Sequence, residues 1–145
     1  MENPEARDHF TNACRNIDMA EILDERAFPE GTVFHCIHAT EALCCSLVRE
    51  AGLEPPKRHK KIPDAALRHL ERFESPLAKP VELELSKLTG SIKTNELRNL
   101  ALYVEPEGLD VEACCPHLRP DVAITSRQML TDVRNLRDSV SSLLA

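Results

Sequence analysis

Apolar residues recur every three or four positions through most of the chain, a spacing that predicts amphipathic α-helices. Five helices are predicted: from Pro4 to about Arg26, from Pro29 to a cap at Gly52, from Ile62 to Phe73, from about Val81 to Tyr103, and from about residue 125 to 144. The alternation at Val81–Leu85 is strand-like but short, and the helical continuation outweighs it. The pattern therefore predicts an all-α fold, an antiparallel four- to five-helix up-and-down bundle that forms one domain over residues 1–145.

The second helix is apolar around most of its circumference, so we expect it at the centre of the bundle. Asn3 and Pro4 supply an N-cap and a first helical residue for the first helix. In the fourth helix, Gly90 separates two apolar stripes and predicts a kink or an interruption. Residues 105–120 contain three prolines and a glycine, which is typical of a long loop.

The net charge of −6 disfavours broad, sequence-independent binding of nucleic acid, since such binding relies on Lys and Arg. The densest basic segment is Lys57-Arg58-His59-Lys60-Lys61, and such a run is most often a solvated loop. The sequence starts without the basic and apolar regions of a secretory leader, and no window reaches the roughly 18 consecutive apolar residues of a membrane span. We therefore expect a cytoplasmic protein without membrane contact, whose six cysteines are reduced and mostly buried.

Three ionisable residues interrupt the apolar second helix. His35, His38 and Glu41 follow one another at intervals of three, so that neighbours share a face. Imidazole and carboxylate groups suit zinc, but no fourth ligand accompanies them, and the favoured interpretation is that neighbouring helices or water satisfy them. A buried carboxylate needs a partner, and Arg98 is the predicted partner of Glu41.

The segment Cys114-Cys115-Pro116-His117 is a second weak metal candidate. Zinc sites usually separate paired cysteines by two or more residues, so adjacent thiols in a loop are the favoured interpretation. The sequence also contains no glycine-rich phosphate loop of the P-loop or dinucleotide-binding type. It therefore predicts neither a cofactor nor a metal site.

Three segments carry a family resemblance: His38-Ala39-Thr40-Glu41-Ala42-Leu43, the stretch 52–59 with a His after a short polar turn, and Arg98-Asn99-Leu100-Ala101-Leu102-Tyr103. They resemble, in the same order along the chain, the second helix, the following turn and the Arg-rich fourth helix of the HEPN domains. These domains are small helical bundles of prokaryotes and of some larger eukaryotic proteins.

The resemblance implies a homodimer whose later helices and connections surround a shared cleft. It also implies one of two roles. Many family members are metal-independent ribonucleases, in which an Arg is followed four to six residues later by a His that acts in acid–base chemistry. Other members bind nucleotides or act as partners of a small nucleotidyltransferase in a toxin–antitoxin pair.

The sequence departs from the ribonuclease pattern, because no Arg has a His four to six residues downstream. We therefore expect a nucleotide- or RNA-associated partner of a nucleotidyltransferase, with nuclease activity impaired or absent. The predicted ligand-binding residues are Arg98, Asn99, Tyr103, Glu41, His59 and Lys57. Two alternatives stay open: a protein–protein interaction module with no small-molecule site, and a metal-independent ribonuclease in which His59 replaces the missing His.

Overall fold

The computed structural model describes the backbone of residues 1–94 and 120–145, and the side chains of residues 1–92 and 125–145. The α-helices in this part are α1 (Pro4–Glu25), α2 (Pro29–Glu50), α3 (Ile62–His69), α4 (Ala78–Thr94) and α7 (Pro120–Leu144), and two short 3₁₀ helices, η1 (His59–Lys61) and η2 (Leu70–Phe73), flank α3. No strand occurs in the same residues. The predicted all-α bundle is therefore confirmed.

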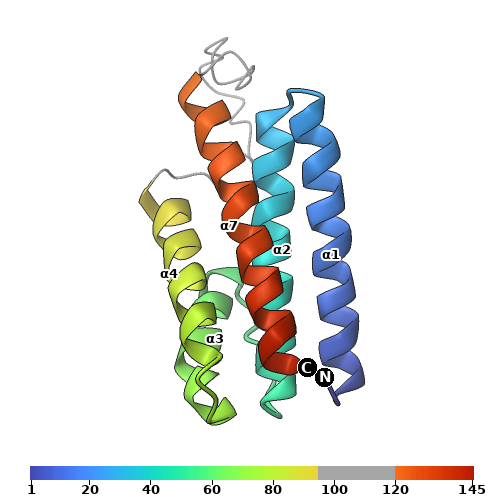
Figure 1. The fold of residues 1–145 in the computed structure, drawn as a ribbon, viewed down its shortest axis with the longest axis vertical. Helices are drawn as coiled ribbons and strands as arrows, with labels where there is room; N and C mark the ends of the chain where they lie inside the picture. Colours follow the sequence, from blue (N-terminus) through green and yellow to red (C-terminus); the bar gives the residue numbers. More distant parts are fainter. Residues whose placement is uncertain (95–119) are drawn as a thin grey trace.

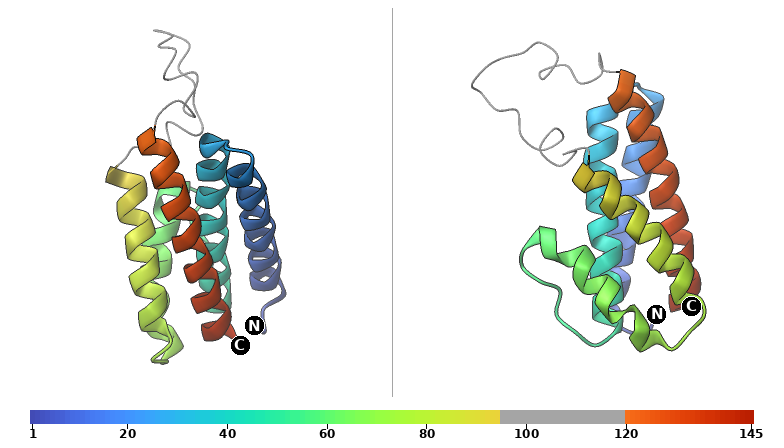
Figure 2. Two further views of the ribbon diagram at one scale, coloured as in Figure 1. Left: turned by 45° about the horizontal axis from the view of Figure 1, so that its top comes forward. Right: turned by 90° about the vertical axis from the view of Figure 1, so that its left-hand side faces the viewer.

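Four long helices alternate in direction along the chain. Helix α1 rises from the base, where both chain ends lie, α2 descends, α4 rises and α7 descends (Figure 1). Helix α2 packs against α1 and α7, and α4 packs mainly against α7. After α2 the chain returns partway up the bundle, and α3 then descends beside α2 (Figure 2, right). The architecture is an up-and-down four-helix bundle with α3 added against α2.

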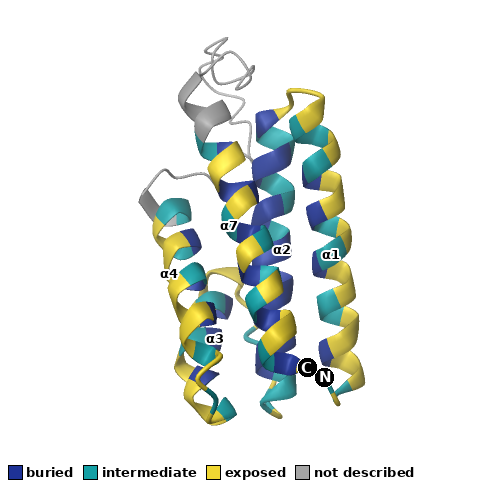
Figure 3. Ribbon diagram, viewed as in Figure 1, coloured by how far each residue is buried: buried dark blue, intermediate teal, exposed yellow. Residues whose placement is uncertain are grey.

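Helix α2 is the centre of this bundle, as its apolar sequence predicts. It packs against α1, α3, α4 and α7, and 15 of its 22 residues are buried (Figure 3). By length and apolar composition, α2 is also the one helix in the described part of the chain that could cross a membrane, which the sequence pattern did not lead us to expect. However, 72% of its apolar window is buried inside the bundle, as is usual for the core helix of a soluble protein.

The helices around α2 complete the core with apolar stripes at helical spacing. The buried members are Ala6, Ala13, Ile17 and Ala20 of α1, Val81, Leu85 and Leu88 of α4, and Met129, Val133, Leu136 and Val140 of α7. The four α7 residues recur at intervals of three and four and so lie on one face of the helix. Three of the four buried α1 residues are alanines, and such small side chains allow neighbouring helices to approach closely.

Two helix starts differ from the prediction because proline is compatible with a first helical turn. Helix α4 begins at Ala78 rather than three residues later, with Pro80 in its first turn, where a backbone N–H would have no helical acceptor. Helix α7 begins at Pro120 rather than near residue 125. Helix α4 passes through Gly90 without an interruption. The predicted continuation of this helix and most of the predicted loop after it lie outside the described residues.

Helices α1 and α2 end in the same way. Each is followed by a residue with a left-handed backbone, Ala27 with φ 58° and Gly52 with φ 78°. The amide after each of these residues donates to a carbonyl five residues earlier, at 2.9 Å in α1 and 3.0 Å in α2. Both ends are therefore Schellman motifs, and Gly52 confirms the predicted cap of the second helix.

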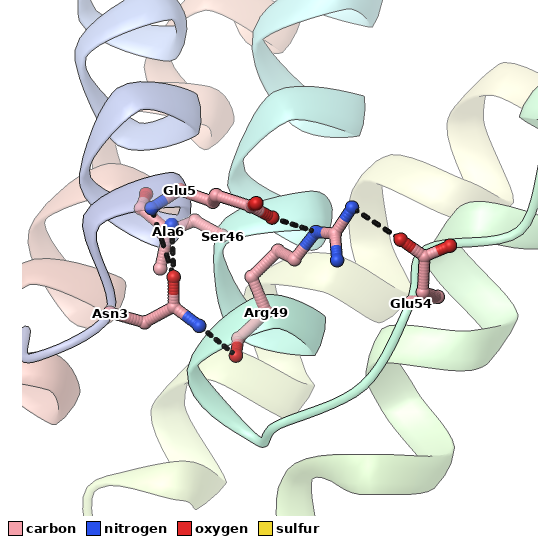
Figure 4. A network of polar contacts seen from close by, with 6 residues as sticks. All are labelled: Asn3, Glu5, Ala6, Ser46, Arg49 and Glu54. Carbon is pink, nitrogen blue, oxygen red and sulfur yellow. Dashed lines mark hydrogen bonds and ion pairs between the residues drawn. The ribbon is translucent and has the colours of Figure 1, made fainter.

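Polar side chains at the base of the bundle join the start of α1 to the end of α2 (Figure 4). The Arg49 guanidinium lies 2.9 Å from the Glu5 carboxylate through Nε and 2.7 Å from the Glu54 carboxylate through Nη2. The buried Ser46 hydroxyl donates to the carbonyl of Ala6 at 2.8 Å. These contacts fix the direction in which the chain leaves α2.

Candidate functional site

A returning segment brings η1 alongside the middle of α2. Gly52 reverses the chain with its left-handed backbone. Pro55 and Pro56 then favour extended conformations for themselves and for the residue before them. Residues 53–58 then run back beside α2 (Figure 2). Glu41 lies eleven residues before Gly52, which corresponds to about 16 Å along a helix. The segment therefore carries His59 from the end of α2 to the level of Glu41.

Glu41 and His59 form a hydrogen bond at this level. Nδ1 of His59 lies 2.8 Å from Oε2 of Glu41, a distance at which the imidazole N–H donates a hydrogen bond to the carboxylate. The side chain of Glu41 is 9% exposed, whereas that of His59 is 60% exposed. The pair thus connects a carboxylate inside the bundle to an imidazole at its surface.

Four cations flank His59 in the sequence. Lys57, Arg58, Lys60 and Lys61 are all exposed. Within the described residues none of the four makes an ion pair. Residues 57–61, which we call the basic run, hold four of the 18 basic residues and none of the 24 acidic ones, so the other 140 residues carry a net charge of −10. Positive charge is therefore concentrated where His59 meets α2.

A shallow hollow extends the basic run onto α3. Lys61, Asp64, Leu67 and Arg68 line it. Nε of Arg68 donates to the carbonyl of Asp64 at 3.3 Å, which holds the guanidinium against its own helix. Two cations, one leucine and one carboxylate therefore line the hollow, which adds the basic side chain of Arg68 to those of the basic run.

The two histidines of α2 do not converge on a metal site. Nδ1 of His35 lies 2.9 Å from Oδ1 of Asn16 in α1. The ring of His38 instead lies against Phe34, with ring centroids 4.4 Å apart. Burial lowers the pKa of His35, and the nearby His38 lowers it further. No group of three or more metal-ligating side chains occurs among the residues that the structure describes. His35 is therefore a polar group satisfied at a helix interface, as the sequence predicted.

The cysteines of α2 are buried and unreactive in character. Burial raises the pKa of Cys36 to about 12 and, together with the charge of Glu41, that of Cys45 to about 11. Burial also raises the pKa of Cys44 well above its ordinary value. Both members of the adjacent pair are buried, because α2 has neighbouring helices on several sides.

The structure brings together only some of the predicted site residues. Glu41, His59 and Lys57 belong to the same region around the basic run. The other ligand-binding candidates Arg98, Asn99 and Tyr103, and the metal candidates Cys114, Cys115 and His117, lie outside the described residues, as does the predicted pairing of Glu41 with Arg98. The contact between Glu41 and His59 was not predicted. Its sequence signal is the Gly52 and Pro55-Pro56 reversal, which indicates a returning chain but not how far it returns.

No protein-family model, curated protein or solved structure gives a significant match to this chain. The site offers an imidazole bound to a carboxylate, four exposed cations and a neighbouring hollow with one more cation.

Proposed function

We propose that this protein is a HEPN-like helical bundle that binds a nucleotide or RNA through its phosphates at the basic run. In this proposal it acts as the homodimeric, cytoplasmic partner of a nucleotidyltransferase in a toxin–antitoxin-type pair. The observation that carries the proposal is the attachment of the run to the bundle, through the bond from exposed His59 to buried Glu41. This attachment distinguishes the run from an ordinary solvated loop.

The distribution of charge supports phosphate binding at this place. Phosphate groups are held by Lys and Arg side chains, and the basic run offers four that make no ion pair within the described residues. The other 140 residues carry a net charge of −10, which disfavours polyanion binding elsewhere, so phosphate contacts should centre on the run and its hollow. The dimer and the nucleotidyltransferase partner rest on the sequence resemblance, and so does the contribution of Arg98, Asn99 and Tyr103.

Thermal-shift titrations with ATP, other nucleotides and short single-stranded RNA test this function. A ligand that binds only the native state stabilises it by about 2.7 kcal/mol at a hundredfold excess over its Kd. We expect a saturable rise in Tm that weakens with salt, because phosphate contacts are screened and release counterions. The rise should be lost in a Lys57→Gln, Arg58→Gln, Lys60→Gln variant.

The matched control replaces Lys79 and Lys87 by Gln. These lysines are also exposed, but they lie on α4 and pair with Glu82 and Glu84. The control should bind like the wild type. Wild-type protein that shows no shift with any nucleotide or RNA would overturn the proposal.

A second candidate function, metal-independent RNA cleavage, is favoured by the orientation of His59. Its Nδ1 is bound to a carboxylate, the arrangement that orients an imidazole for proton transfer through Nε2. In that reaction Nε2 accepts the proton of a ribose 2′-hydroxyl while the 2′-oxygen attacks the adjacent phosphorus. The bond from phosphorus to the 5′-oxygen breaks, the 5′-oxygen takes a proton from water, and the resulting hydroxide takes the proton from Nε2. The neighbouring cations would stabilise the negative charge that develops on the phosphate oxygens.

Incubation of RNA with the protein in the presence of a chelator tests the second candidate. Cleavage by the wild type but not by a His59→Ala variant would establish it. Intact RNA in both samples would exclude it and leave the binding function as proposed.

A further inference from the structure

We infer that Glu41 is a positioning residue, which fixes the basic run against the bundle by holding His59. The effect of Glu41 on ligand binding rests on the proposed function. Glu41 itself is too deeply buried to contact a ligand on the surface, since only 9% of its side chain is exposed. It acts through the imidazole that it binds.

The attachments of the segment show why this bond matters. The segment is held at its start by the ion pair between Glu54 and Arg49, and at its end by the buried side chain of Ile62. Between these two residues, His59 makes the one side-chain bond that the structure describes. All four cations of the run lie within two residues of His59. Among the described residues, this bond is therefore the one side-chain attachment within the run.

The chemistry of Glu41 also favours this role. A carboxylate is costly to bury, and an apolar helix such as α2 does not need one for packing. Here the buried charge lies beneath a segment with four cations, to which it gives a fixed counter-charge. Fixing the cations before the ligand arrives reduces the loss of conformational entropy on binding. Glu41 thereby contributes to affinity without contacting the ligand.

Limited digestion with trypsin measures the position of the run without any ligand, because the run contains four trypsin sites. In the full-length protein, Glu41→Gln should increase cleavage after Lys57, Arg58, Lys60 and Lys61 by roughly three- to tenfold, within the range for the loss of one hydrogen bond. His59→Ala, which changes an exposed side chain, should do the same. The variant with both Glu41→Gln and His59→Ala should show no further increase in cleavage, since each change removes the same bond.

Two further variants separate positioning from a general loss of structure. Glu84→Gln removes a carboxylate that is 14% exposed and paired with Lys87 on α4, so cleavage within the run should stay at the wild-type rate. His59→Asn retains a donor close to the position of Nδ1 and should restore part of the protection. Unchanged cleavage in both Glu41→Gln and His59→Ala would overturn the inference.

Titration of the same variants with ATP separates this inference from the proposed function. Glu41→Gln should weaken ATP binding by roughly three- to tenfold, and His59→Asn should recover part of that loss. If wild-type protein binds no ATP, other nucleotide or RNA, the proposed function fails, whereas faster cleavage of the run in Glu41→Gln still establishes the positioning role. If ATP binds and Glu41→Gln leaves both its affinity and the cleavage rate unchanged, only the positioning role fails.

Discussion

Asn3 closes one end of α1 and one end of α2 with a single side chain, through its bonds to α1 amides and to the carbonyl of Arg49 (Figure 4). Its Oδ1 accepts from the amides of Glu5 at 2.9 Å and Ala6 at 3.2 Å. Its Nδ2 donates to the Arg49 carbonyl at 2.9 Å. The first turn of α1 has amide N–H groups without helical acceptors, and the last turn of α2 has carbonyl groups without helical donors. The side-chain amide of Asn3 carries both an acceptor and a donor, so it binds to both helix ends.

Replacing Asn3 with Ala should therefore lower the free energy of unfolding by about 1–2 kcal/mol, more than a cap alone commonly contributes. The measurement is the midpoint of urea unfolding. Asn135→Ala, on the exposed face of α7, is the control and should change stability by less than about 0.5 kcal/mol. Equal effects of the two substitutions would show that Asn3 does not join the helices.

The left-handed residues after the two helices predict substitutions with opposite effects on stability. Ala27→Gly should stabilise the protein by about 0.5–1 kcal/mol, because glycine relieves the strain of a positive φ. Gly52→Ala should destabilise it by about 1 kcal/mol. A Cβ at Gly52 would meet nothing within 4 Å, so this loss comes from the backbone alone. Urea unfolding of both variants checks the signs, and a stabilising Gly52→Ala would contradict the prediction.

The thiols of α2 should resist alkylation in the native protein. The reactive form is the thiolate, and burial raises the pKa of Cys36 to about 12 and of Cys45 to about 11. Iodoacetamide at mildly alkaline pH should modify Cys36, Cys44 and Cys45 only in concentrated guanidinium chloride, as peptide mass mapping would show. Because the charge of Glu41 adds to the effect of burial on the pKa of Cys45 but not on that of Cys36, Glu41→Gln should speed the reaction of Cys45 more than that of Cys36. Rapid native modification of Cys36 would contradict its burial.

His35 should make the protein less stable in mild acid. Its pKa is lowered in the native state from an ordinary value of 6.5, mainly by burial. The native state therefore binds fewer protons than the unfolded state as the pH falls through 6.5, and protonation favours unfolding. Stability of the wild type should fall over this range more steeply than that of His35→Gln. Parallel pH profiles of unfolding free energy for the two proteins would show that His35 has no such effect.

The parts of the fold that depend on local periodicity could be predicted from the sequence. The apolar spacing from Met129 to Val140 places one face of α7 in the core, and the uniformly apolar sequence of α2 places that helix at the centre. Proline positions misled the prediction of helix starts, because Pro80 and Pro120 are compatible with first turns as well as with links.

The contacts of the candidate site were harder to predict, because they join residues that are far apart in the sequence. Glu41 and His59 were predicted separately as candidates, Glu41 as a polar residue in an apolar helix and His59 from the family resemblance. Their bond depends on the path of the segment after Gly52, which tertiary packing determines. The bond between His35 and Asn16 likewise depends on how α1 and α2 are rotated against each other. Periodicity specifies which face of a helix is buried but not which polar residue it meets.

The short turn between α1 and α2 has a consequence for the order of folding. Residues 26–28 alone join this helix pair, so its contacts close a small loop, whereas α7 reaches α2 only after the whole intervening chain has been brought round. We expect the α1–α2 hairpin to form in the transition state and α7 to dock late. Ile17→Val should then mainly slow folding, and Val140→Ala should mainly speed unfolding, in stopped-flow measurements. The lifetime of the native state would therefore depend chiefly on the helix that completes the bundle last.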